Sequence, residues 1–138
     1  MISFVVPGQP QAKGRPRLST RGGFARAYTP AKTVAYEGLI ALAGQEAMAG
    51  RAPMDGPVSV AITATFQIPK SWSKRQRAAA ETGHLAHTGK PDLDNIAKAV
   101  GDGLNGIVWA DDSQVARLTM DKRYGAAPGL CIAVEPLS

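Results

Sequence analysis

The stretch GPVSVAITATFQIP, residues 56–69, carries apolar side chains at every second position. In an extended chain these side chains share one face, and they are Val58, Val60, Ile62, Ala64, Phe66 and Ile68. The alternation predicts a long, half-buried strand that ends at Pro69. A strand with one apolar face needs another layer packed against that face.

The segments before this strand predict one helix and one further strand. Thr29 and Pro30 form a helix start, with threonine as the N-cap and proline at the first helical position. The helix is expected to cover residues 30–49 and to end near Gly50; its apolar positions are Val34, Leu39, Ile40, Leu42 and Ala43. ISFVVPG near the N-terminus is expected to be an opening strand that stops at Pro7.

The segments after the strand add two helices and two strands. SWSKRQRAAAETG, residues 71–83, predicts a short basic helix capped by Ser71 or Ser73 and stopped by Gly83. A loop and a second helix follow, and that helix runs to about Asn105. Residues 115–125 and 129–137 are expected to be strands. The order β–α–β–α–α–β–β predicts an α/β (α+β) single domain, in which helices cover mainly one face of a mixed β-sheet.

Composition and length place the chain among globular proteins of one domain. Its 138 residues are 44% hydrophobic, and no apolar run approaches the roughly 18 residues that span a bilayer. The N-terminus lacks the features of a signal peptide, so we expect a cytoplasmic protein. The single cysteine, Cys131, excludes an intrachain disulfide, and its apolar neighbours favour a buried structural thiol.

Charge is strongly segregated along the chain, whose net charge is +5. Residues 1–32 carry six cations and no acid, residues 70–90 carry five cations and one acid, and six of the seven aspartates lie between 92 and 121. This pattern favours a polyanion that must reach an acidic centre, although a solvated basic surface would give the same counts. The candidate DNA-binding residues are Lys13, Arg15, Arg17, Arg21, Arg26, Lys74, Arg75 and Arg77.

Residues 9–28 are rich in glycine, proline and arginine and show no periodicity, so they predict a long loop. Arginine binds phosphate in a forked geometry, and Phe24 and Tyr28 could stack on unpaired bases. The alternative is a merely flexible arm.

The acidic centre begins with Asp92 and Asp94 in KPDLDN, residues 90–95. Pro91 disfavours helical geometry at the preceding residue, and two residues of an extended segment share a face at i and i+2. The two carboxylates would therefore point the same way if the helix begins at or just after Asp94. Ile96, Ala99, Val100, Gly103 and Leu104 fit the apolar stripe of that helix, which leaves Asp94, Lys98 and Asp102 on a polar face.

Clustered carboxylates are typical of a metal site. Asp111 and Asp112, which follow Trp109, can bring a further carboxylate to the pair, and oxygen ligands favour Mg²⁺ or Mn²⁺. Such a centre could activate water and clamp a phosphate, with Lys98 stabilising developing charge. The alternative is structural: Asp94 caps the helix and forms an ion pair with Lys98.

Two histidines lie in the loop just before this segment. His84 and His87 are expected to be exposed polar residues rather than ligands, with His87 left open as an auxiliary acid–base group or phosphate contact.

The stretch KPDLDNIAKAVGDGLNGIVWADDSQV, residues 90–115, resembles the signature of the RusA family of Holliday-junction resolvases. PGQPQAKGRPR, residues 7–17, resembles the N-terminal segment of phage and prophage members. The resemblance implies a RusA-like fold and a homodimeric, Mg²⁺-dependent endodeoxyribonuclease that cuts four-way junctions in DNA recombination and repair.

The resemblance also implies the roles of individual residues. It maps the catalytic, metal-binding aspartates onto Asp92, Asp94 and Asp112 and the essential lysine onto Lys98, with a weaker assignment for Asp111 as a metal ligand. Two other functions stay open from the residues themselves. One is a non-catalytic DNA-binding module, and the other is a nuclease acting on flaps, forks or plain duplex.

Overall fold

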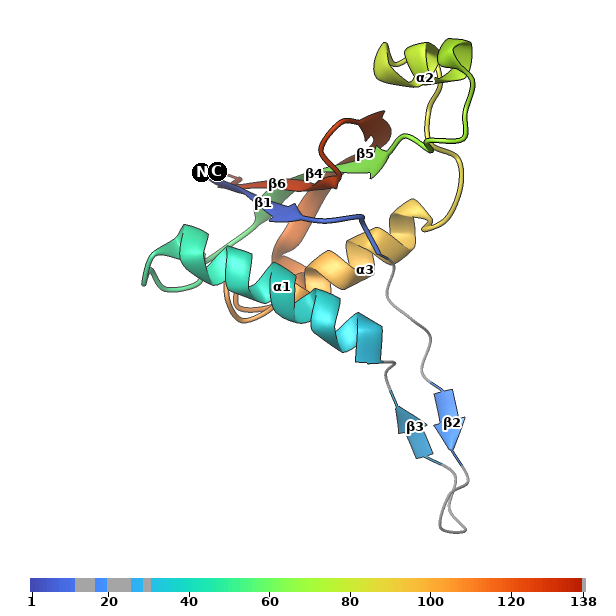
Figure 1. The fold of residues 1–138 in the computed structure, drawn as a ribbon. Helices are drawn as coiled ribbons and strands as arrows, with labels where there is room; N and C mark the ends of the chain where they lie inside the picture. The colour runs from blue at the N-terminus through green and yellow to red at the C-terminus, as the bar shows by residue number, and fades with distance from the viewer. Residues whose placement is uncertain (12–16, 20–25, 29–30, 138) are drawn as a thin grey trace.

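A mixed four-stranded sheet in the order β1-β6-β4-β5 organises the chain (Figure 1). In this computed structural model residues 1–11, 17–19, 26–28 and 31–137 are described, with backbone alone at 17–19, 26–28 and 31–34. The sheet strands are β1 (Ile2–Pro7), β4 (Val58–Gln67), β5 (Val115–Gly125) and β6 (Gly129–Pro136). β6 is antiparallel to both β1 and β4, whereas β5 runs parallel to β4. The stretch of alternating apolar residues that forms β4 is therefore an inner strand.

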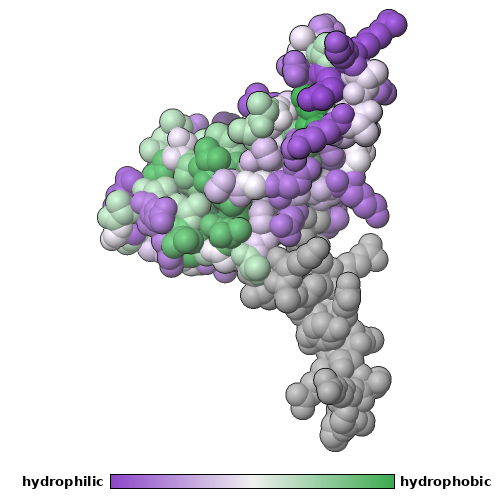
Figure 2. All heavy atoms as spheres, viewed as in Figure 1, coloured by the Kyte–Doolittle hydropathy of each residue, from purple (hydrophilic) through white to green (hydrophobic). Residues whose placement is uncertain are grey.

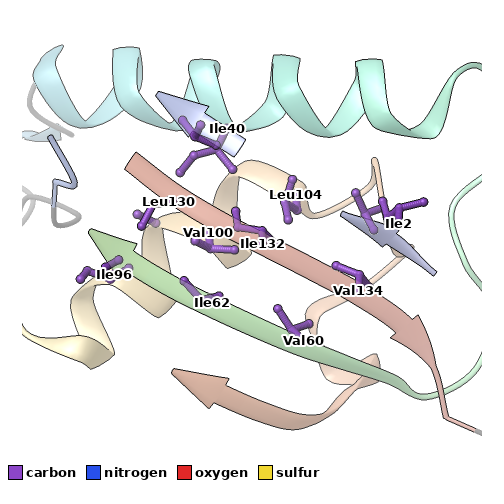
Figure 3. Packing of buried hydrophobic residues seen from close by; sticks show 14 of the residues in the cluster. Ile2, Ile40, Val60, Ile62, Ile96, Val100, Leu104, Leu130, Ile132 and Val134 are labelled. Carbon is purple, nitrogen blue, oxygen red and sulfur yellow. The ribbon is translucent and has the colours of Figure 1, made fainter. Parts of the chain in front are cut away.

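Two helices cover one face of this sheet, as predicted. They are α1 (Ala31–Met48) and α3 (Leu93–Leu104). Figure 3 shows Ile40 of α1 and Leu104 of α3 pointing toward the apolar side chains of β4 and β6. The two helices pack closely because a Cβ at Gly103 would lie only 2.8 Å from Ile40 Cγ2, and one at Gly44 only 2.6 Å from Leu104 Cδ2. This packing fixes α3, which carries much of the candidate site, on the sheet.

The opposite face of the sheet is not covered by the described helices, and Cys131 lies there. Leu130, Ile132 and Val134 of β6 are buried under the helices, while the intervening Cys131 is an exposed free thiol. The expectation of a buried thiol was wrong, because successive side chains of a strand point to opposite faces whatever the apolar content of the run.

Two elements lie outside the helical layer formed by α1 and α3 (Figure 1). α2 (Lys74–Glu81) begins at Ser73, whose side chain forms a capping box with Gln76. β2 (Arg17–Ser19) and β3 (Arg26–Tyr28) pair with each other in a separate two-stranded sheet. The prediction of an irregular loop over residues 9–28 was therefore wrong for these two strands. The predicted helix start at Thr29 and Pro30 lies outside the described residues.

Apolar residues that remain exposed gather over α1, on the side of the molecule away from α2 (Figure 2). Leu39 and Leu42 of this helix are about half exposed, although both counted toward its predicted apolar positions. Among the described residues, no helix is both long and apolar enough to cross a membrane.

Candidate active site

α3 begins one residue after Asp92, earlier than the sequence predicted. Asp92 is the N-cap, with φ −71° and ψ 155°, and its carbonyl accepts the first helical hydrogen bond from Ile96 N at 3.1 Å. Asp94 therefore lies inside the first helical turn, and the expected shared face of an extended segment does not form. The side chain of Asp92 makes no capping hydrogen bond. Both carboxylates lie at the helix N-terminus, where negative charge is favoured.

The two faces of α3 are divided as predicted. Its buried residues are Ile96, Ala99, Val100, Gly103 and Leu104. The polar face lines a cavity of about 560 Å³ with Asp94, Lys98 and Asp102. Strand residues of β4 and β5 form the apolar wall across from α3: Val60, Ile62, Val115, Leu118 and Met120. Leu118 is 47% exposed although it lies on the helix-covered face, so the cavity opens where the helical layer ends above β5.

Asp112 joins Asp94 and Lys98 at this cavity from a separate part of the chain. Its carboxylate accepts a hydrogen bond from the buried Trp109 Nε1, 2.8 Å from Oδ1. It also lies against α3 at Gly101, where a Cβ would be 3.5 Å from Oδ2. The buried indole thus holds one carboxylate oxygen by a hydrogen bond, and the glycine on the neighbouring helix leaves room beside the other oxygen. Sequence reasoning assigned Trp109 no role beyond its place in the motif.

Asp111 has a different task from its neighbour. It caps the short 3-10 helix Asp112–Gln114: its carboxylate accepts from Ser113 N at 3.0 Å and from the Ser113 hydroxyl. These hydrogen bonds lower the pKa of Asp111. Gln114 completes the capping box and donates to the carbonyls of Met54 and Gly56, both at 2.8 Å. Gln114, which sequence reasoning also missed, therefore ties the turn that carries Asp112 to the segment before β4.

The carboxylates do not all converge in this conformation. Asp94 and Asp112 line the cavity, whereas Asp92 and Asp111 do not. Within the described ranges, no three histidine, cysteine or acidic side chains are grouped closely enough to hold a metal ion. Carboxylates that line one cavity still suit a hard cation such as Mg²⁺, which takes one or two carboxylates and keeps several waters.

The two histidines before α3 differ in environment. His84 is exposed, as expected, with its Nδ1 2.7 Å from Thr82 Oγ1. His87 is not an exposed polar residue: its ring stacks on Phe66 with centroids 3.6 Å apart, and its Nδ1 is buried without a hydrogen-bond partner. Burial and, secondarily, Lys122 lower the pKa of His87.

The candidate DNA-binding residues fall into two groups. Lys74, Arg75 and Arg77, hereafter the α2 cations, are exposed on α2, the part of the molecule where Figure 2 shows a concentration of hydrophilic residues. Arg17 lies in β2 and Arg26 in β3. Lys13, Arg15 and Arg21 lie outside the described residues.

A cavity lined by three aspartates and a lysine, with exposed basic residues on α2, suits an enzyme acting on phosphodiesters. Comparison with known proteins gives the class: the model of the family described as endodeoxyribonuclease RusA matches residues 7–135. The chain belongs to the RusA family of endodeoxyribonucleases. It is also 37% identical over 139 residues to the protein named "Uncharacterized protein YqaN" of Bacillus subtilis (strain 168), covering 99% of this chain and 97% of that protein.

Proposed function

We propose that this protein is a divalent-metal-dependent endodeoxyribonuclease that resolves four-way DNA junctions as a homodimer, in DNA recombination and repair. The observation that carries the proposal is the meeting of Asp94, Lys98 and Asp112 at one cavity, because they come from two separate segments of the chain. Family membership supports the reaction class and a branched DNA substrate.

Mg²⁺ (or Mn²⁺) would be held by Asp94 and Asp112, and when bound it supplies charge neutralisation and an activated water. Asp92, one residue before the helix and free of a capping bond, is the third candidate ligand and would have to turn toward the cavity. Lys98 lies one turn after Asp94 on the same face, so its ammonium group can bind the scissile phosphate and stabilise negative charge developing there.

The remaining surfaces suit a large branched polyanion. The α2 cations present phosphate-binding groups away from the cavity, so DNA contacted there can extend beyond the cleavage site. A four-way junction offers two strands related by a two-fold axis, and a homodimer would place one such site on each.

The test is incubation of the purified protein with a synthetic four-way junction, with and without Mg²⁺, reading the cut positions on a sequencing gel. We expect Asp94→Asn, Asp112→Asn and Asp92→Asn to abolish cleavage and to keep junction binding, since loss of negative charge reduces repulsion of the phosphates. Asp121→Asn is the matched control, because Asp121 is an exposed aspartate of β5 that does not line the cavity.

The outcomes separate the competing functions. Binding of the junction without metal-dependent cleavage of any DNA would indicate a non-catalytic DNA-binding module. Faster cutting of flaps, forks or plain duplex than of junctions, under one salt condition, would keep the nuclease and change its substrate. If the Asp94→Asn and Asp112→Asn proteins cut at the wild-type rate, the site assignment is wrong.

A further inference from the structure

The segment that joins α2 to α3 leads directly to Asp92 and has no regular secondary structure of its own. It covers residues 83–91. At the α2 end it is held by backbone hydrogen bonds from Gly83 N to Ala80 O at 3.3 Å and from Leu85 N to Ala79 O at 3.1 Å. Because the other end carries a proposed metal ligand, whatever holds that end influences the place of Asp92.

His87 is the main contact of the segment with the sheet. Its ring lies flat on Phe66 of β4, with centroids 3.6 Å apart and planes within 7°. Tyr124 of β5 lies beside both rings, since it pairs with Phe66 in the β4–β5 register and its own ring is 5.2 Å from that of His87. The imidazole thus packs against an aromatic pair at the carboxyl ends of two parallel strands.

Lys122 of β5 supplies a second contact to the segment, at Gly89, two residues after His87. It precedes Tyr124 on the same face of β5, and its ammonium group donates a hydrogen bond to the carbonyl oxygen of Gly89. The same nitrogen lies 5.6 Å from the Phe66 ring centroid, within cation–π range. The segment is therefore clamped at His87 and at Gly89, three residues before Asp92.

The state of the imidazole argues that packing is its task. Nδ1 is buried without a partner, so it neither donates to nor accepts from the described protein groups. Burial and the Lys122 charge favour the neutral ring. A neutral ring with one nitrogen enclosed is suited to stacking and poorly suited to moving protons through that atom.

We propose that His87 is a positioning residue, whose ring on Phe66 holds residues 83–91 against β4 and β5 and thereby fixes Asp92 at the start of α3. The catalytic consequence rests on the proposed function, whereas the anchoring itself does not. Tyr124 extends the same cluster to α2, because its ring meets that of Trp72 edge-on at 5.2 Å, just before that helix. The helix that carries the α2 cations and the segment that leads to Asp92 thus share one aromatic support.

The experiment compares His87→Ala, His87→Phe and the control His84→Ala, which removes an exposed histidine from the same segment. Hydrogen–deuterium exchange of the peptide spanning residues 84–92 should accelerate in His87→Ala and return to the wild-type rate in His87→Phe, which keeps the stack. Junction cleavage in Mg²⁺ should follow the same order, with kcat falling about 10- to 100-fold in His87→Ala, KM unchanged, and most of the loss recovered in His87→Phe. Lys122→Met, which keeps the aliphatic stem and loses the donor to Gly89, should change exchange in the same direction.

Each outcome decides the matter. Exchange in His87→Ala that matches the wild type would overturn the anchoring role. A His87→Phe protein with a protected segment and cleavage as slow as His87→Ala would show that the imidazole acts chemically, which also overturns the proposal. If the wild type cuts no DNA, the proposed function fails while the exchange rates still report whether the ring anchors the segment. His87→Phe keeps an aromatic ring and removes an unpartnered buried nitrogen, so no hydrogen bond of that atom is lost.

Discussion

Replacing Trp109 with phenylalanine tests whether the cleavage rate depends on the orientation of the Asp112 carboxylate. The change keeps an aromatic ring in a site that is 1% exposed and removes the Nε1–H donor, which lies 2.8 Å from Asp112 Oδ1. The carboxylate would then be free to rotate away from the direction in which it faces Asp94 and Lys98. We expect the cleavage rate to fall while junction affinity stays the same.

The magnitude follows from the hydrogen bond. A bond to a charged group contributes about 1.5–3 kcal/mol, which corresponds to roughly 10- to 150-fold in rate if all of it orients the reacting carboxylate. The smaller ring also leaves a void, so the free energy of unfolding should fall. The loss should be smaller than that of a full truncation to alanine, which costs about 3–5 kcal/mol. Urea unfolding should give that loss, and cleavage should be measured under conditions in which both proteins are folded.

A control variant makes the result decisive. Tyr36→Phe is that control, because Tyr36 is a buried aromatic residue of α1 that does not line the cavity, and it should cut at the wild-type rate. A folded Trp109→Phe protein that cuts at the wild-type rate would refute the reasoning.

Three further predictions concern stability and binding. Gly103→Ala should destabilise the fold by about 1–3 kcal/mol in urea unfolding, because its Cβ would clash with Ile40. Gly101→Ala on the same helix should be neutral or stabilising. Equal losses of stability in the two variants would contradict the close α1–α3 contact. Asp111→Ala should lower the midpoint of thermal unfolding at neutral pH and lose this effect in acid. Because the pKa of Asp111 is lowered in the folded protein, its carboxylate stabilises the fold above the ordinary carboxyl pKa, and this contribution vanishes as pH falls through the folded-state pKa. A difference in midpoint that does not depend on pH would exclude the mechanism. Changing all three α2 cations to glutamine should reduce the slope of log K against log salt by about 2–3 in junction-binding titrations, and an unchanged slope would place the DNA elsewhere.

Local periodicity predicted the elements well, because burial within one helix or strand repeats at the spacing of its own geometry. The buried stripe of α3 and the alternating face of β4 both follow from residues within a few positions of one another. The predicted start of α3 was wrong by about two residues, because Asp92 and Asp94 are both good N-caps and the local sequence does not choose between them.

The error at His87 and the omission of Gln114 share a cause, which is that the deciding contact lies far away in the sequence. His87 packs on Phe66 and Tyr124 and is clamped next to Lys122, none of which is near it in the chain. Similarly, the donors of Gln114 reach Met54 and Gly56, some 60 positions earlier. A sequence read through its periodicities shows which faces are buried, but not which side chain meets which.

The adjacent acids Asp111 and Asp112 show how one motif divides support from chemistry. Both hydrogen bonds from Ser113 to the Asp111 carboxylate end on Oδ2, so this side chain caps the turn that presents its neighbour, and it does not line the cavity. Asp112 receives one hydrogen bond from Trp109 and otherwise faces the cavity, so binding a cation there breaks nothing that holds the turn. The two residues are chemically identical, and the different backbone positions they occupy leave Asp112 as the one that lines the cavity on which the proposed function rests.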